Sequence, residues 1–122
     1  MRECGGIAAL VGLLAPGVAA AVRERAAAAL GSLCYKNTRN QDSVRECGGV
    51  AALVALLAPA QHASVQEMAA SALTTLTSEG QPGREAVRAC GGVEALERVL
   101  ACASSATAHE GAAAALRNLG HV

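Results

Sequence analysis

The sequence predicts an all-α protein in which three similar helical units stack side by side as a solenoid. A segment that begins Arg-Glu-Cys-Gly-Gly at residue 2 returns at residue 45, and a close variant returns at residue 88, each time after 43 residues. When residues 1–43 are laid over 44–86, 21 of the 43 positions are identical. A repeat of this length is a supersecondary unit that cannot bury its apolar face alone, so we expect the copies to pack on one another.

The composition agrees with closely packed helices. The chain has 30 alanines and a single aromatic residue, Tyr35. Small residues let helices approach one another, whereas a β-rich domain usually contains aromatic and β-branched residues. The formal net charge is zero and the basic residues are scattered, so we expect no binding to nucleic acid or to an anionic membrane surface. No run of apolar residues is long enough to predict a transmembrane helix.

An apolar stripe follows the double glycine of each copy. Its residues have the spacing i, i+3, i+6, i+7, which places them on one side of an α-helix. The three stripes are Ile7, Leu10, Leu13 and Leu14; Val50, Leu53, Leu56 and Leu57; and Val93, Leu96, Val99 and Leu100. Pro16 and Pro59 end this helix in the first two copies.

A second and longer helix follows in each copy. Its apolar residues are Val22, Ala26, Ala29, Leu30 and Leu33; Val65, Ala69, Ala72, Leu73 and Leu76; and Ala108, Ala112, Ala115, Leu116 and Leu119. We expect the six leucines of this set to be buried. The patterns Ser64-x-x-Glu67 and Thr107-x-x-Glu110 predict capping boxes at two of the three helix starts.

A short helix precedes the double glycine in two copies, at about 40–47 and 82–90. Asn40 is the expected cap of the first of these helices, and Pro82 suits the opening turn of the second. The glycine pairs then form a sharp corner where a Cβ would obstruct close approach of the backbone. We therefore divide the single array of residues 1–122 into repeats at about 1–39, which lacks the short helix, 40–81 and 82–122.

Five cysteines are present, and three of them occupy the same repeat position. Cys4, Cys47 and Cys90 would each lie about one repeat spacing, roughly 10 Å, from the next in a stack, which exceeds the reach of a disulfide. We expect the cysteines to be small buried hydrophobic residues with free thiols in a reducing compartment. This points to the cytoplasm, with the nucleus as an alternative.

The repeats resemble the armadillo (ARM) repeat family. The resemblance rests on Gly-Gly-Val-Ala-Ala-Leu-Val-Ala-Leu-Leu at 48–57 and Val-Gln-Glu-Met-Ala-Ala-Ser-Ala-Leu-Thr-Thr-Leu at 65–76, and it covers essentially the whole chain. HEAT repeats are similar but usually lack the short first helix and the glycine corner. The resemblance implies a right-handed superhelix whose third helices line a concave groove that holds extended peptides.

The sequence departs from the armadillo repeats that read nuclear localisation signals. Those repeats, as in the importin-alpha receptors, carry an Asn on the third helix and a Trp one turn before it. The matching Asn positions are Ser32, Thr75 and Asn118, and the matching Trp positions are Ala28, Ser71 and Ala114. Without Trp, the chain lacks slots for the aliphatic stems of basic side chains. A nuclear transport receptor is therefore disfavoured.

An acidic residue stands two helical turns before the Asn position in every copy: Glu24, Glu67 and Glu110. If the family geometry holds, these residues form a ladder along the groove that weakly attracts a basic partner segment. The alternative is that two of them only complete capping boxes. The resulting candidate partner-binding groove consists of Glu24, Ser32, Glu67, Ser71, Thr75, Glu110 and Asn118.

No arrangement of residues predicts catalysis. His62, His109 and His121 have no neighbouring set of Asp or Cys that would complete a triad or a metal site, and we expect no cofactor. The sequence predicts a non-catalytic protein–protein interaction module that binds an extended protein or peptide partner. Alternatives are the interaction segment of a larger enzyme such as a ubiquitin ligase, a structural scaffold of a cytoskeletal or ciliary assembly, and a part of a longer repeat array.

Overall fold

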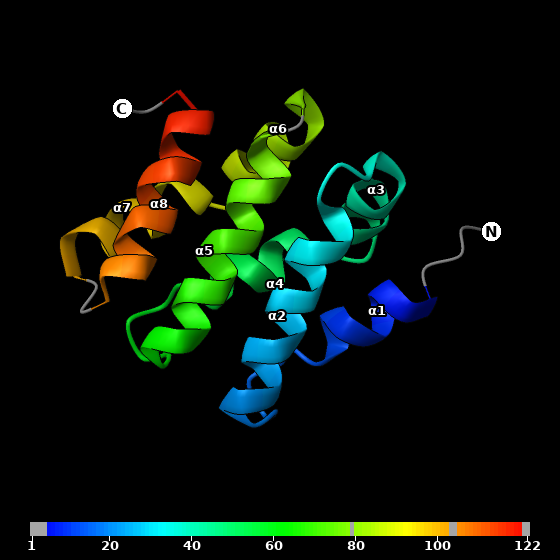
Figure 1. The fold of residues 1–122 in the computed structure, drawn as a ribbon, viewed down its shortest axis with the longest axis horizontal. Coiled ribbons are helices and arrows are strands. Elements are labelled where there is room, and N and C mark those ends of the chain that lie inside the picture. The colour runs from blue at the N-terminus through cyan, green and yellow to red at the C-terminus, as the bar shows by residue number, and fades with distance from the viewer. Residues whose placement is uncertain (1–4, 79, 103–104, 121–122) are drawn as a thin grey trace.

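The computed structural model describes residues 5–78, 80–102 and 105–120, and in these ranges every regular element is a helix (Figure 1). The helices are α1 (Gly5–Gly12), α2 (Ala20–Cys34), α3 (Thr38–Glu46), α4 (Gly49–Ala55), α5 (Ala63–Ser78), α6 (Gln81–Ala89), α7 (Gly92–Cys102) and α8 (Ala106–Asn118). The predicted all-α class is confirmed.

The helices form three units that stack along the chain. Helices α1 and α2 make the first unit, α3 to α5 the second, and α6 to α8 the third. The long helices α2, α5 and α8 lie side by side in one row, with α5 packed between the other two (Figure 1). Helices α1, α4 and α7 pack behind the long helix of their own unit. The row of long helices therefore forms one continuous face of the molecule.

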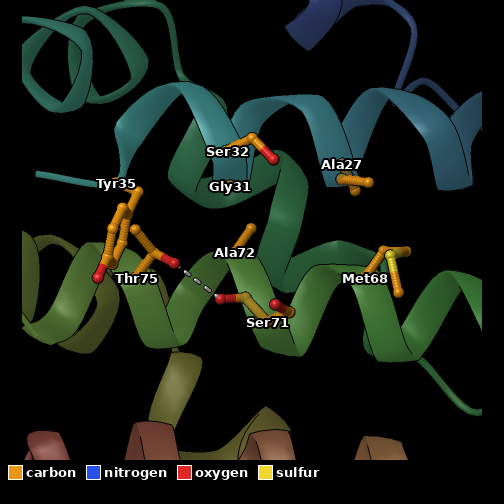
Figure 2. A pocket seen from close by; sticks show the side chains of 9 residues that line it. Ala27, Gly31, Ser32, Tyr35, Met68, Ser71, Ala72 and Thr75 are labelled. Carbon is orange, nitrogen blue, oxygen red and sulfur yellow. Dashed lines mark hydrogen bonds between the residues drawn. The ribbon is translucent and has the colours of Figure 1, made fainter. Parts of the chain in front are cut away.

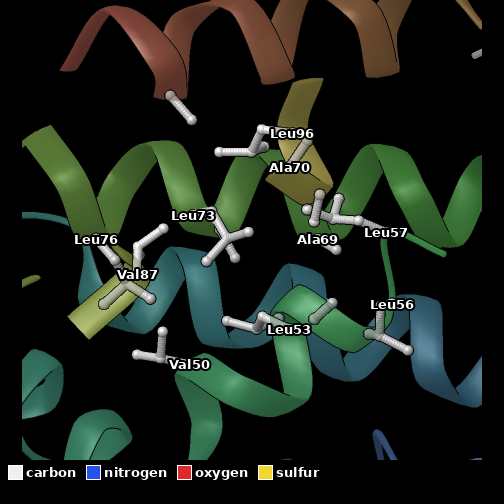
Figure 3. Packing of buried hydrophobic residues seen from close by; sticks show 14 of the residues in the cluster. Val50, Leu53, Leu56, Leu57, Ala69, Ala70, Leu73, Leu76, Val87 and Leu96 are labelled. Carbon is white, nitrogen blue, oxygen red and sulfur yellow. The ribbon is translucent and has the colours of Figure 1, made fainter. Parts of the chain in front are cut away.

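The core lies between the long helices and the helices behind them. Leu30, Leu73 and Leu116 are at most 1% exposed, as the periodicity predicted. Figure 3 shows Leu73 and Leu76 of α5 facing the apolar side chains of α4 and α6. The prediction is wrong for Leu33, which is 42% exposed. Helix α2 begins the row, so within the described residues no long helix covers the side of α2 that faces away from α5.

The double glycines turn the chain sharply between the short helix and the next one. Gly48 and Gly91 have φ of +78° and +77°, in the left-handed region that a side chain disfavours. A Cβ on Gly49 or Gly92 would lie 2.6 or 2.3 Å from a Cγ atom of the valine five residues earlier. The predicted role of these glycines in a close backbone approach is confirmed.

The sequence predicted the start of one short helix correctly and that of the other incorrectly. Pro82 lies in the first turn of α6, as predicted. The cap of α3 is Asn37, whose side chain accepts a hydrogen bond from the backbone N–H of Asn40 at 2.9 Å. The prediction of Asn40 as the cap is wrong, because its Nδ2 donates to the carbonyl oxygen of Leu33 at 2.6 Å and ties α3 to the end of α2.

The predicted capping boxes do not form. Ser64 and Thr107 lie inside α5 and α8, one position beyond the first helical residue. The cap of α8 is Ser105, whose Oγ accepts a hydrogen bond from the backbone N–H of Ala108 at 3.2 Å. The glutamates at 67 and 110 are therefore not explained by capping of their own helices.

The cysteines differ in their burial. Cys34 is buried, and desolvation raises the pKa of its thiol to about 11. Cys47 is half-buried, while Cys90 and Cys102 are exposed, so the expectation that the repeated cysteine is buried is wrong for Cys90. Cys34, Cys90 and Cys102 have free thiols. Cys4 lies outside the described residues.

Two leucines of the long helices, one buried and one exposed, give a test of the stack. We expect Leu73→Ala to lower the free energy of unfolding by about 2–5 kcal/mol, because it leaves a cavity in the core. Leu33→Ala, at an exposed position, should lower it by less than about 1.5 kcal/mol. Urea unfolding followed by circular dichroism measures both values. Equal losses would contradict the burial of Leu73 and the exposure of Leu33.

The buried thiol of Cys34 gives a pH test. Only the thiolate reacts with maleimide or iodoacetamide, so at pH 8 we expect Cys90 and Cys102 to be labelled well before Cys34. Because the folded-state pKa of Cys34 lies above the unfolded value of 9.0, the free energy of unfolding should fall as the pH rises from about 9 to about 11. Peptide-resolved mass spectrometry measures the labelling. A Cys34→Ala variant should lose this part of the pH dependence.

Candidate functional site

The row of long helices carries two hollows that open on the same face. The first lies between α2 and α5 and has a volume of about 450 Å³; it is lined by Ala27, Ala28, Gly31, Ser32, Tyr35, Met68, Ser71, Ala72 and Thr75. The second lies between α5 and α8 and has a volume of about 370 Å³; it is lined by Glu67, Met68, Ser71, Thr74, Thr75, Thr107, Glu110, Gly111 and Ala114. Three residues of α5 line both hollows, which therefore form one surface, called the groove below.

Small residues set the depth of the groove. A Cβ on Gly31 would lie 3.4 Å from the Cα of Ala72, so α2 and α5 are in van der Waals contact at the bottom of the first hollow. Figure 2 shows Tyr35 at one end of this hollow and Met68 at the other. The hollow is therefore shallow, with an apolar floor and larger side chains at both ends.

Hydroxyl groups line the walls of the first hollow. Thr75 Oγ1 donates a hydrogen bond to the carbonyl oxygen of Ser71 at 3.3 Å, within α5 (Figure 2). Among the described residues, the hydroxyls of Ser32 and Ser71 have no hydrogen-bond partner, and both serines are exposed. A serine hydroxyl can donate to a peptide carbonyl or accept from a peptide N–H. These two groups can therefore bind the backbone of an extended segment.

Carboxylates line the second hollow. Glu67 is half-buried, and its Oε2 accepts a hydrogen bond from Ser105 Oγ at 2.5 Å, which links α5 to the start of α8. Glu110 is exposed on α8. No basic side chain belongs to the lining of this hollow. The second hollow is therefore acidic, whereas the first is lined by uncharged residues.

Five of the seven residues that the sequence predicted for the groove line one of the two hollows: Ser32, Glu67, Ser71, Thr75 and Glu110. Glu24 is half-buried on α2 and lines neither hollow. Asn118 also lies outside both, because its Nδ2 donates to Thr74 O and to Thr77 Oγ1, each at 3.2 Å. The amide that was expected to hold a partner is bonded to the neighbouring helix instead.

Among the groove residues that the sequence did not predict, two have large side chains, Tyr35 and Met68. Tyr35 is 62% exposed, and Lys36 Nζ lies 5.4 Å from the centre of its ring. Met68 contributes to both hollows. A signal was present for Tyr35, since it is the single aromatic residue and stands three positions after Ser32, which places the two on the same side of a helix.

The side chains that could bind a metal ion are scattered over the described part of the chain. Within residues 5–78, 80–102 and 105–120, no three His, Cys, Asp or Glu side chains are grouped so that they could hold a metal ion. His62 and His109 are exposed, and His121 lies outside the described residues. The helices of the described part are all too short or too polar to cross a membrane.

The fold and the groove define a helical repeat solenoid in which the long helices form one open face. A model of the armadillo/beta-catenin-like repeat matches residues 37–78 and 80–121, which is more than half of the chain. The chain belongs to the armadillo repeat family, as the glycine corners and the repeated third helix predicted.

Several solved structures with the same fold are engineered or designed proteins. One engineered protein is 31% identical, with a TM-score of 0.87 over 95% of this chain and 46% of its own. A designed armadillo repeat protein is 25% identical, with a TM-score of 0.83 over 94% and 47%. Another, solved in complex with the peptide (KR)4, is 24% identical, with a TM-score of 0.84 over 93% and 46%. The chain thus spans about half the length of these structures. No curated protein matches it.

Proposed function

We propose that this chain is a non-catalytic protein-binding module that holds an extended segment of a partner protein in the groove across α2, α5 and α8. The observation that carries the proposal is the pair of adjoining hollows, which share Met68, Ser71 and Thr75. A segment that crosses α5 would contact both hollows at once. The hydroxyls of Ser32 and Ser71 are placed to bind its backbone.

The difference between the two hollows indicates which side chains of the partner each hollow can hold. The first hollow suits an aliphatic side chain, which would pack between Tyr35 and Met68 over an alanine and glycine floor. The second suits a basic side chain, which would lie beside Glu67 and Glu110. Neighbouring helices are about 8–10 Å apart, and an extended chain advances about 3.3 Å per residue. The aliphatic and the basic residue should therefore be about three positions apart.

The comparison with designed proteins supports this mode of binding at the level of the fold. The designed armadillo repeat protein that was solved with (KR)4 holds a peptide that alternates two basic residues. In the present chain, exposed charge pairs should contribute only about 0–1 kcal/mol each. We infer that the two carboxylates bias the choice of partner, while contacts with the backbone and with the first hollow supply the rest of the affinity.

The charge of the second hollow can be tested with a defined peptide. Fluorescein-labelled (KR)4 should bind more tightly than a neutral (GS)4 peptide of equal length, and its affinity should fall as salt rises. Glu67→Gln with Glu110→Gln should weaken binding about 3- to 10-fold, because it removes one half-buried and one exposed carboxylate from the second hollow. Fluorescence anisotropy measures the dissociation constants.

The control for charge is Glu94→Gln with Glu97→Gln, which removes two exposed carboxylates from α7, behind the groove. This variant should bind (KR)4 nearly as well as the parent. If the control loses as much affinity as the groove variant, the interaction follows overall charge, and the second hollow is not the site of the basic residue.

The shape of the groove can be tested without changing its charge. Ser71 is exposed and lines both hollows, so Ser71→Trp should fill the place where they meet and weaken peptide binding by about 10-fold or more. Ala51→Trp adds the same side chain at an exposed position of α4, away from the groove, and should leave binding unchanged. Equal binding by both variants would show that the peptide does not cross α5.

A further inference from the structure

The first unit exposes three large apolar side chains that are buried in the other two units. Leu13 and Val22 are each 39% exposed, and Leu33 is 42% exposed. These residues, called the N-terminal face below, have equivalents 43 and 86 positions later in the sequence. None of the equivalents is more than 3% exposed: Leu56, Val65 and Leu76 in the second unit, and Val99, Ala108 and Leu119 in the third.

In the second and third units, the preceding unit covers the residues that correspond to the N-terminal face. In the second unit, Leu56 adjoins a hollow of about 260 Å³ whose other wall includes Val11 and Leu14 of the first unit. On the long helix, the Cα of Ala72 is in contact with Gly31 of α2. In the third unit, Val99 adjoins residues of the second unit in the same way. In each case the cover is the C-terminal side of the preceding repeat.

The opposite end of the stack does not present a matching apolar face. Gly31 and Thr74 each contact the following unit, Gly31 at Ala72 and Thr74 through a 3.0 Å hydrogen bond from its Oγ1 to the carbonyl oxygen of Gly111. The equivalent residue of the third unit is Arg117, which is exposed.

A second charged residue, Glu97, lies on α7, the helix behind α8. Val11 and Val54 are half-buried and pack against the core, whereas the equivalent Glu97 is exposed. A head-to-tail contact between two copies would bury Arg117 and Glu97 against the N-terminal face. Burying charges without partners is strongly unfavourable. The two charges therefore disfavour a second copy of this chain as the cover of the N-terminal face.

We propose that the N-terminal face of Leu13, Val22 and Leu33 binds the C-terminal side of one further armadillo-type repeat. That repeat carries a small or aliphatic residue where the third unit has Glu97, and a small or uncharged residue where it has Arg117. Its third helix lies beside α2 in the relation that α2 has to α5, and it lengthens the row of helices that carries the groove. This inference is independent of peptide binding, because it rests on burial, contacts and charge at equivalent positions of the repeats.

The test is to supply such a repeat from the chain itself. A copy of residues 44–86 fused directly before residue 1 keeps the 43-residue register, because residue 87 corresponds to residues 44 and 1. Amide hydrogen exchange of α2 is measured in the parent and in the extended chain. We expect exchange in α2 to slow by about 10-fold or more, because the first unit gains a neighbour. In the extended chain, Leu33→Glu should remove most of this protection, while in the parent it should change little.

The matched control is the same extension with Val54→Glu and Thr74→Arg in the added copy, which gives that copy the charges of the third unit. This control should not protect α2. The proposal is overturned if the control protects α2 as well as the plain extension does, or if the plain extension gives no protection. It is also overturned if circular dichroism shows the added copy unfolded on a folded parent. Sedimentation of the parent as a dimer that Leu33→Glu dissociates would assign the face to a second copy instead.

Discussion

The close approach of the three long helices is the constraint on which the rest of the molecule depends. It requires small residues at the contacts: a Cβ on Gly31 would lie 3.4 Å from the Cα of Ala72, and one on Gly111 would lie 2.9 Å from the Cβ of Ala70. Larger side chains there would separate the helices and open the core beneath Leu73. The same contacts make the groove shallow and leave hydroxyls rather than bulky side chains on its walls. Packing and the proposed binding surface therefore have one physical origin.

The sequence predicted those parts of the fold that depend on spacing within one unit. Leu73 and Leu116 are buried because their helix periodicity places them toward the helices behind, and the glycine corners follow from backbone geometry alone. Leu33 has the same periodicity, but its environment depends on whether another helix lies beside α2. The cap of α8 lies at Ser105 rather than Thr107. Both positions have a hydroxyl, so the local pattern does not distinguish them. The hydrogen bond from Ser105 to Glu67 favours Ser105 as the cap.

The candidate site was predictable to the same degree and for the same reason. Ser71 and Thr75 are four residues apart on one helix, so their common place in the groove follows from the helical period. Asn118 stands at the same repeat position as Thr75, yet its amide bonds to Thr74 and Thr77 of the neighbouring unit. An interaction across 41 or 44 residues is not visible in the period of one helix. The pattern within one helix predicts which residues lie on the groove face. The contacts between units determine which of their polar groups are already bonded to a neighbouring helix.

The units are alike in their apolar cores and unlike in their polar contacts, and this difference has a consequence for binding. Between the second and third units, the bond of Glu67 with Ser105 and that of Thr74 with Gly111 span the helix pair. At the equivalent positions of the first pair, Gly31 has no side chain to form the second of these bonds. Instead the hollow there is bordered by Tyr35 and Met68. An extended segment lying across α5 therefore meets an apolar hollow on one side and an acidic hollow on the other. A segment with its aliphatic and basic residues in the reverse order would place a charge over the apolar floor, where it loses hydration without gaining a partner. If the groove holds an extended segment as proposed, the differences between the repeats would favour one direction of that segment, which a stack of identical units would not do.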